Sequence, residues 1–372
     1  MRYNKHMRRV LLFVILLLIV GVLLVNGVKH KVKQDLAQPL ISAQISPTPV
    51  SQKTVPIASG EHDTTSLFVP YWTIAGGDLS ETDYDQYLYF GVTPAKNGIN
   101  KDENGYARLE SFVSSVPEGK EKLLVLRMLE SDSNLAILKN KEMQKKVIAE
   151  TAALAKEHGF DGVILDLELS AIPFDSLIAQ IREFNAEFYT GIKQSGLSYG
   201  ITIYGDTFYR LRPFDIKAIA QNTDNILVMA YDFHKSRGNP GPNFPLAGKN
   251  TYGYDMATMS DDFLKFVPKE KMTVIFGLFG YDWEVDNKGN ATSHGEALTN
   301  HEITKQFLSG CQYENCSIKR DAPSEETFIR YTDDGKKAHT VWFEDTESVK
   351  AKQSYLRGKG ITSFSFWANS YF

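Results

Sequence analysis

The chain has 372 residues, of which 42% are hydrophobic and 23% charged, so it can bury a sizeable core and lacks the composition of a disordered protein. Its formal net charge is -4 and charges of both signs are interspersed. No basic stripe is available to neutralise phosphates, which argues against nucleic acid as a partner. The sequence has no GxGxxG, GxxxxGKS/T or HExxH motif, so we expect no cofactor and no metal.

The N-terminal region carries a long apolar segment. Residues 10–28 are uncharged and almost wholly apolar, and a helix of this length is about long enough to cross a bilayer. A cleaved signal peptide is the alternative, but its apolar region is usually shorter and closely followed by a cleavage site of small residues. We therefore expect residues 1–33 to form a cytoplasmic tail and a transmembrane signal anchor. This predicts a membrane-anchored protein whose folded part is extracytoplasmic, at the cell surface.

Residues 34–65 have a different composition. They are rich in Ser, Thr, Pro, Gln and Ala and show no sustained apolar period. Such a composition is typical of a flexible linker, so we expect a stem without secondary structure.

From Ser66 onward, short apolar runs alternate with longer amphipathic ones, such as 143–158 and 174–195. This alternation is typical of repeated βα units around a parallel sheet. The predicted strands are residues 66–72, 86–92, 122–128, 162–168, 199–204, 225–232, 272–279 and 361–367. Eight such strands close a barrel, so we expect residues 66–372 to form an α/β fold, the (β/α)8 TIM barrel.

A polar, glycine-rich stretch over residues 282–338 interrupts this pattern between the seventh and eighth strands. It holds the two cysteines of the chain, Cys311 and Cys316, with no His or Cys cluster nearby to complete a zinc site. A disulfide across a short loop is the preferred interpretation, and two free thiols are the alternative. Residues 339–343 are expected to return the chain to the barrel rim.

Polar residues that end barrel strands are the first candidates for chemistry, because active sites of such barrels form at the carboxyl ends of the strands. Asp166 and Glu168 lie two residues apart on the fourth strand, so their side chains point the same way. Repulsion and partial burial would keep a proton on the pair near neutral pH, as a general acid requires. The alternative is that the pair only ends the strand and binds loop amides. Tyr231 and Asp232 end the sixth strand at the same rim, where they could serve the site or act as a core aromatic and a cap.

These motifs resemble those of glycoside hydrolase family 18. FDGVILDLE, at residues 160–168, is similar to the family's DGxDxDxE signature, whose last Glu is the acid. VMAYD (228–232), GLFGYDW (277–283) and the stretch 341–367 are similar to the family's later segments and occur in its order. The residues of these motifs most resemble those of the family branch that includes spore and cell-wall N-acetylglucosaminidases.

The resemblance implies a retaining mechanism in which the acetamido oxygen of the substrate attacks the anomeric carbon. Glu168 would be the acid and later the base, and Asp166 would orient the acetamido group. Tyr231 would hydrogen-bond to that group, Asp232 would support the site, and Trp367 would stack beneath the sugar. Further substrate contacts would come from Tyr71, Met229, Tyr281 and Trp283, and supporting roles would fall to Asp161 and Gly162.

Two departures from the family pattern are visible. Ile164 replaces the middle acid of the signature, so Asp166 lacks the inner partner that shares its proton in many relatives, and we expect weak activity. The third strand ends in residues 127–133 instead of a small Ser-Gly-Gly segment, which indicates an altered cleft wall near Arg127 or Glu130.

The resemblance implies hydrolysis of β-glycosidic bonds in glycans that contain N-acetylglucosamine, either chitin-like or peptidoglycan. We expect a monomer that is attached to the membrane through its N-terminal helix. A catalytically silent barrel that binds such glycans at the cell surface is the alternative. The combination of Asp166, Glu168 and Tyr231 favours the enzyme, because a binding module has no need of it. An unrelated fold of structural function would bind no sugar.

Overall fold

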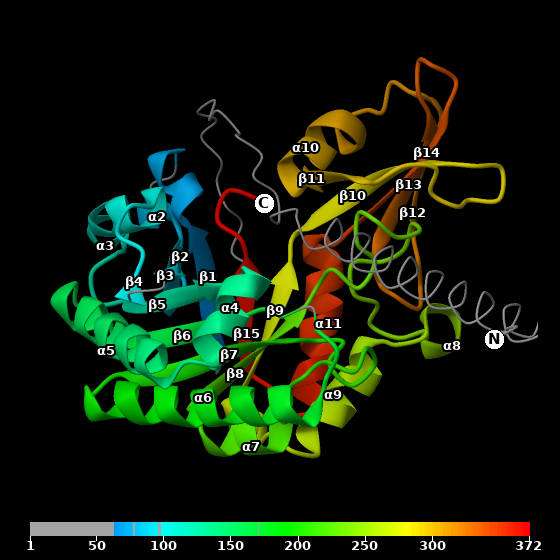
Figure 1. The fold of residues 1–372 in the computed structure, drawn as a ribbon. Helices are drawn as coiled ribbons and strands as arrows, with labels where there is room; N and C mark the ends of the chain where they lie inside the picture. Colours follow the sequence, from blue (N-terminus) through cyan, green and yellow to red (C-terminus); the bar gives the residue numbers. More distant parts are fainter. Residues whose placement is uncertain (1–62, 77–78, 96–97, 170) are drawn as a thin grey trace, which may run out of the picture. The chain divides into compact units, whose positions relative to one another are not determined.

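The computed structural model describes residues 63–372, apart from residues 77–78, 96–97 and 170. Its centre is a closed barrel of parallel strands in the order β1-β15-β9-β8-β7-β6-β5-β2 (Figure 1). The strands are β1 (Thr64–Pro70), β2 (Gln86–Val92), β5 (Glu121–Met128), β6 (Gly162–Leu167), β7 (Ser198–Tyr204), β8 (Asn225–Ala230), β9 (Met272–Gly277) and β15 (Ser363–Trp367). Each coincides with a predicted strand, so the predicted eight-stranded barrel is confirmed.

Helices cover the outside of the barrel (Figure 1). They are η1 (Tyr71–Gly76), η2 (Leu79–Glu81), α2 (Asn104–Ala107), α3 (Leu109–Ser115), α4 (Ser131–Leu138), α5 (Lys141–Glu157), α6 (Asp175–Gln194), α7 (Ile216–Gln221), α8 (Lys249–Tyr252), α9 (Met256–Leu264), η3 (Lys269–Lys271) and α11 (Thr346–Gly358). A small hairpin of β3 (Pro94–Ala95) and β4 (Gly98–Ile99) lies between β2 and α2. The first turn of α5 illustrates a local cause: the Asn140 side chain accepts the otherwise unpaired N–H groups of Glu142 and Met143.

The strands alternate between two apolar layers. On β6, Val163 and Leu165 pack outward against the helices, whereas Ile164 belongs to the cluster that fills the barrel interior. Successive side chains of a strand point to opposite faces, so the next inward position after Ile164 is that of Asp166. The alternation that builds the core therefore also directs this carboxyl group into the barrel.

An antiparallel sheet with the strand order β11-β10-β14-β13-β12 is inserted between β9 and α11 (Figure 1). Its elements are β10 (Phe279–Val285), β11 (Glu296–Thr299), α10 (Asn300–Ile303), the π-helical turn η4 (Thr304–Leu308), β12 (Glu314–Arg320), β13 (Thr327–Thr332) and β14 (Ala338–Phe343). Residues 339–343 form most of β14, and their predicted return to the barrel rim stays a prediction. They lie in β14, between β10 and β13, because their alternating buried side chains complete the apolar face of this sheet.

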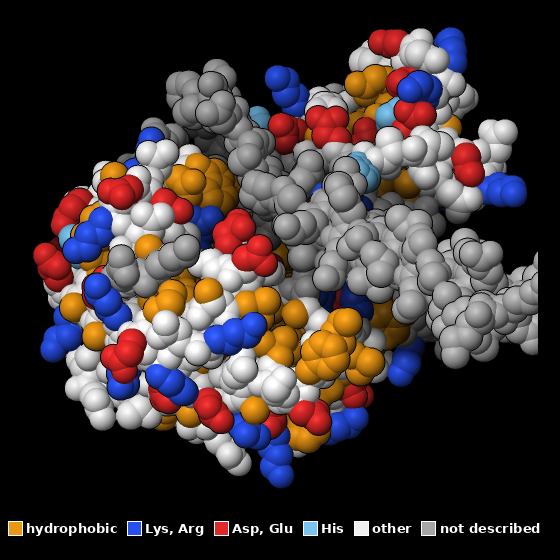
Figure 2. Space-filling model, viewed as in Figure 1, with side chains coloured by type: hydrophobic (Ala, Val, Ile, Leu, Met, Phe, Trp, Pro, Cys, Tyr) orange, Lys and Arg blue, Asp and Glu red, His pale blue; other side chains and the backbone are white. Residues whose placement is uncertain are grey.

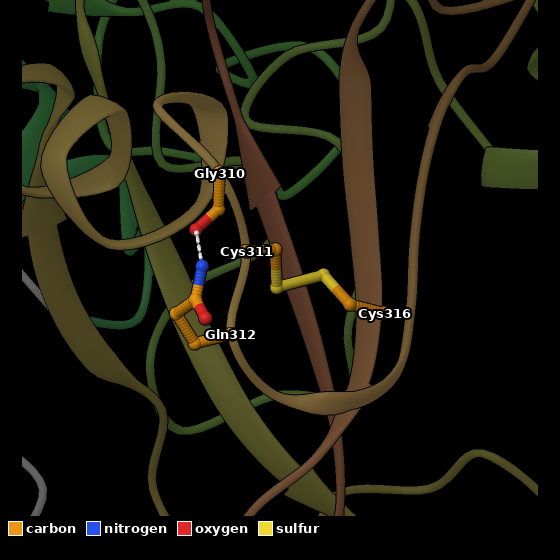
Figure 3. The surroundings of a disulfide bond; sticks show 4 residues. All are labelled: Gly310, Cys311, Gln312 and Cys316. Atoms are coloured by element: carbon orange, nitrogen blue, oxygen red, sulfur yellow. Dashed lines mark hydrogen bonds between the residues drawn. A yellow bond between two sulfur atoms is a disulfide. The ribbon is translucent and has the colours of Figure 1, made fainter.

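A disulfide bond joins Cys311, which follows η4, to Cys316 in β12 (Figure 3). Their Cα atoms are 6.4 Å apart, within the range of such bonds. Beside them the Gln312 side chain donates a hydrogen bond to the Gly310 carbonyl. Of the two interpretations considered for these cysteines, the structure has the disulfide and not the free thiols.

The predicted tail and anchor at residues 1–33, and nearly all of the predicted stem, lie outside the described residues. Within the part of the chain that is described, no helix combines the length and apolar character needed to cross a bilayer. On this finding the predicted membrane-anchored, extracytoplasmic location is corrected and is not retained.

Over the face shown in Figure 2, acidic and basic side chains are interspersed, as the sequence indicates.

Candidate active site

Two carboxyl groups at the end of β6 are each held by a hydroxyl group of β7. Thr202 donates a hydrogen bond of 2.5 Å to Oδ1 of Asp166, and Tyr204 donates one of 2.8 Å to Oε2 of Glu168. Asp166 is buried, with 2% of its surface exposed, while Glu168 keeps part of its surface open. The two acids and the two hydroxyl groups repeat with the same spacing on neighbouring parallel strands, so each acid meets one hydroxyl.

Both acids are electrostatically poised to keep a proton. Burial raises the pKa of Asp166 to about 7, and the neighbouring Glu168 raises it as well, against the opposing effects of Thr202 and Arg127. Burial also raises the pKa of Glu168, whereas Lys235 and the hydrogen bond from Tyr204 lower it. Interacting carboxyl groups titrate as a pair. The pair can therefore retain one proton close to neutral pH.

Tyr231 follows directly after β8 and lies in the same electrostatic environment. Burial raises the pKa of its phenol, and the charges of Asp166, Glu168 and Asp232 raise it further. Its ring stacks on that of Trp367, with centroids 6.3 Å apart and an angle of 20° between the planes. The structure thus brings the phenol, both acids and the tryptophan at the end of β15 into one site.

Asp232 adopts a backbone conformation that few residues with side chains tolerate. Its φ is 58°, in the left-handed region, where short polar residues such as Asp are less strained than others. The backbone N–H of Asp232 donates a hydrogen bond of 2.7 Å to the side-chain oxygen of Asn243. The Tyr281 hydroxyl donates one of 2.8 Å to the carboxylate of Asp232. Asp232 is therefore fixed from both its main chain and its side chain.

Aromatic side chains line one side of the barrel mouth. The partly exposed Trp367 packs against Phe90 and Phe68, with centroid distances of 4.7 and 5.5 Å. Tyr71, also partly exposed, lies against Trp72 at 5.0 Å. Such rings offer flat apolar faces together with polar edges, which suits contact with sugars.

Three predicted substrate contacts are buried. Met229 lies on the inward face of β8 within the barrel interior. Tyr281 and Trp283 lie in β10 of the inserted sheet, where Tyr281 supports Asp232. Trp283 has no exposed surface, and its indole N–H donates to the carbonyl of Ser236. Its contacts fasten the inserted sheet to the loop after β8 and leave no face for a sugar.

Asp161 and Gly162 lie at the amino end of β6, opposite the acids. The carboxylate of Asp161 accepts a hydrogen bond of 2.8 Å from the N–H of Lys122 at the start of β5. A Cβ atom at Gly162 would stand 1.9 Å from the hydroxyl oxygen and 2.9 Å from the carbonyl oxygen of Ser198, so a larger residue would push against the neighbouring strand. Both positions secure the barrel and do not contact the acids.

Sequence reasoning missed the residues that β7 and its following loop contribute. Besides Thr202 and Tyr204, the guanidinium of Arg212 lies 4.0 Å from the Tyr204 ring centre and pairs with Asp206 at 3.0 Å. A signal was present: Thr202 and Tyr204 are polar residues on alternate positions of an otherwise apolar strand. The contribution of Lys235 could not be read from the sequence, since it depends on how the loop after β8 folds back.

Of the two candidate residues in the altered cleft wall, Arg127 is the one that lies at this site. It is the direct neighbour of Asp166 in the register of β5 and β6. Its guanidinium lies 4.6 Å from the ring centre of Phe90, 5.4 Å from Tyr71 and 5.8 Å from Trp72. Glu130, the other candidate, is exposed at the residue before α4.

The fold and these side chains define a class of protein: a parallel (β/α)8 barrel with two neighbouring acids of raised pKa and an aromatic wall at its carboxyl end. The sequence profile of glycosyl hydrolases family 18 matches residues 78–371. The chain belongs to this family.

Individual proteins are similar to this chain in sequence or in fold. The cortical fragment-lytic enzyme of Bacillus anthracis is 23% identical over 298 residues, covering 75% of this chain and 63% of that protein. The crystal structure of the Bacillus cereus spore cortex-lytic enzyme SleL aligns with a TM-score of 0.68 and 17% identity, covering 83% of this chain and 71% of that one. A class V chitinase from Nicotiana tobaccum aligns with a TM-score of 0.70 and 17% identity, covering 82% and 94%.

The chain spans about half to two thirds of the length of curated bacterial relatives, 52% of a Bacillus subtilis glycosylase and 63% of the B. anthracis enzyme. At 17% identity the two solved structures establish the fold alone.

Proposed function

We propose that this chain hydrolyses β-glycosidic bonds in glycans that contain N-acetylglucosamine, chitin-like polymers or peptidoglycan, and that residues 66–372 form the hydrolase unit as a monomer. The observation that carries the proposal is the pair Asp166 and Glu168, held by β7 hydroxyl groups beside the Tyr231 phenol. Membership of family 18 and the names of its cortex-lytic and chitinase relatives support it.

In the proposed first step, Glu168 gives its proton to the glycosidic oxygen. Tyr204 already donates a hydrogen bond to Oε2 of this residue, which leaves Oε1 to carry the proton towards the substrate. The acetamido oxygen of the sugar attacks the anomeric carbon as the bond to the protonated leaving oxygen breaks. A cyclic oxazolinium ion remains on the sugar, and the leaving chain departs with the proton.

Asp166 and Tyr231 act on the acetamido group in this scheme. The carboxyl group of Asp166 orients that group and offsets the positive charge that develops on it, and the Tyr231 hydroxyl hydrogen-bonds to it. In the second step, the Glu168 carboxylate takes a proton from a water molecule whose oxygen attacks the anomeric carbon. The oxazolinium ring opens to restore the acetamido group, and the configuration at the anomeric carbon is retained.

Binding without turnover is the second candidate, and Ile164 is the observation that favours it. Its apolar side chain is 3% exposed and occupies the inward position next to Asp166 along β6. Position 164 therefore offers no carboxyl group that could exchange a proton with Asp166. Arg127, the neighbour of Asp166 on β5, instead lowers the pKa of Asp166.

A comparison with Glu168→Gln separates the two candidates. Glutamine keeps the size of the side chain, and its amide oxygen can still accept the Tyr204 hydrogen bond, but it cannot donate an acidic proton. Fluorophore release from a chitooligosaccharide and from a muropeptide-derived substrate should fall by at least about 100-fold in the variant, while binding measured by calorimetry persists. Equal rates in both proteins would remove the enzyme proposal, and binding with no turnover in the unmodified protein would establish the second candidate.

A further inference from the structure

A buried group of charged side chains lies between the inserted sheet and α11. The ammonium nitrogen of Lys352 is 2.7 Å from Oε1 of both Glu326 and Glu344, and all three side chains are fully buried. Glu326 precedes β13 and Glu344 follows β14, so the group joins the inserted sheet to the helix. Burying three ionisable groups is costly, and such a group is weak grounds for inferring stability.

The two glutamates differ in their other contacts. Glu326 accepts the backbone N–H groups of Asn243 at 2.5 Å and Phe244 at 2.8 Å, in the loop that follows β8. Among the described residues, the hydrogen bonds of the Glu344 side chain go to α11, to Lys352 and to the hydroxyl group of Ser348. Burial raises the pKa of Glu344 to about 8, and its Oε2 has no hydrogen-bond partner among the described residues. The connection to the loop thus runs through Glu326 alone.

Asn243 carries the connection to the site. Its side-chain oxygen accepts the N–H of Asp232, and its amide nitrogen donates to the carbonyl of Gly277 at the end of β9, at 2.8 Å. Its own carbonyl accepts the N–H of Phe233 at 2.7 Å. The left-handed backbone of Asp232, and with it the direction in which Tyr231 leaves β8, is therefore fixed by a residue that Glu326 holds.

We propose that Lys352 and Glu326 are positioning residues for the proposed hydrolysis: through Asn243 they hold the loop after β8 so that Tyr231 and Asp232 face the acids of β6. Lys352 fixes the Glu326 carboxylate, and that carboxylate fixes the loop backbone. The inserted sheet becomes part of the frame of the site. This inference rests on the proposed function, so its test needs one readout that does not depend on turnover.

Glu326→Gln and Glu344→Gln form a matched pair for this test. Each replaces one carboxyl group beside Lys352 with an amide of the same size. Only Glu326→Gln puts an N–H donor where the loop offers N–H groups, so it breaks a hydrogen bond to the loop. Kinetics on a chitooligosaccharide would be measured together with hydrogen exchange, by mass spectrometry, of peptides that cover residues 231–244.

Glu326→Gln should lower kcat by about tenfold or more with little change in KM, because small displacements of reacting groups cost rate. Amide exchange in residues 231–244 should rise by a similar factor. Glu344→Gln should match the unmodified protein in both readouts. Equal effects of the two substitutions, or unchanged exchange in Glu326→Gln, would overturn the inference. A chain that never hydrolyses the substrate would refute the proposed function. Hydrogen exchange would still decide whether Glu326 and Lys352 hold the loop after β8.

Asn243→Ala tests the same connection if Glu326→Gln does not fold. It leaves the buried charges intact and removes the side-chain hydrogen bonds to Asp232, Gly277 and Phe279. We expect a similar loss of kcat and faster exchange of the Asp232 segment. A kcat equal to that of the unmodified protein would overturn the inference.

Discussion

The hydroxyl group of Tyr204 donates a 2.8 Å hydrogen bond to Oε2 of Glu168, so the proposed acid is held by a residue of the neighbouring strand. This bond favours the ionised carboxylate and lowers the pKa of Glu168. Tyr204→Phe should therefore raise that pKa and move the alkaline limb of the kcat/KM profile upward by roughly one pH unit. A pH series on a fluorogenic chitooligosaccharide checks this. A limb that stays in place or moves to lower pH would contradict the assigned donor.

Asp166→Asn should make the protein more stable while reducing activity. The folded-state pKa of Asp166 is about 7 against an ordinary value of 3.8. The folded chain therefore binds more protons than the unfolded chain between these values, and stability falls as pH rises through that window. The burial penalty is absent below about pH 4 and complete above about pH 7, where it amounts to a few kcal/mol.

Thermal unfolding at pH 4 and pH 8 measures this effect. Asparagine is nearly the same size and can accept the Thr202 hydrogen bond, so the variant should unfold at a higher temperature than the unmodified protein at pH 8 and at a similar temperature at pH 4. The reverse order at pH 8 would show that Asp166 is stabilised as an anion.

Arg127 should act on the site through its charge. It lowers the pKa of the adjacent Asp166, so Arg127→Met should raise that pKa above about 7 and carry the alkaline limb upward. Arg127→Lys keeps the charge and is the matched control, although it loses the planar stacking on Phe90. Identical profiles for the methionine and lysine variants would show that packing, and not charge, is what Arg127 contributes.

Trp367 should contribute to substrate affinity. Its partly exposed ring lies beside Tyr231, and we take its stacking on a sugar to be worth about as much as an aromatic pair, roughly 0.5–1.5 kcal/mol. Trp367→Ala should weaken chitooligosaccharide binding by up to roughly tenfold, while Trp283→Phe, at a fully buried position, should leave the affinity near that of the unmodified protein. Calorimetric titration distinguishes them. The opposite pattern would restore Trp283 as a sugar contact.

The barrel could be predicted from the sequence because each strand is a short apolar run and each inward acid breaks that run. Asp166 and Glu168 stand out on β6 for this reason. Alternation on β7 carries the same kind of signal in Thr202 and Tyr204, and it was overlooked because hydroxyl-bearing residues are common in ordinary strands.

What could not be predicted depends on long-range folding. Residues 339–343 have the pattern of a strand, but nothing local says that they pair with β10 and β13 of an inserted sheet. The buried contact of Lys352 with Glu326 joins residues far apart in the chain, and charged residues are normally expected at the surface. Trp283 belongs to a motif that suggested a sugar contact, yet its indole is enclosed by the loop after β8.

Proton NMR of the first products from a chitooligosaccharide tests the central claim most directly, because the anomer released reports the geometry of attack. Attack by the acetamido oxygen, with Glu168 as acid and then base, predicts that the β-anomer appears first and converts slowly to the equilibrium mixture, and that Glu168→Gln releases none. An α-anomer released first, or the same products at the same rate from Glu168→Gln, would contradict the account.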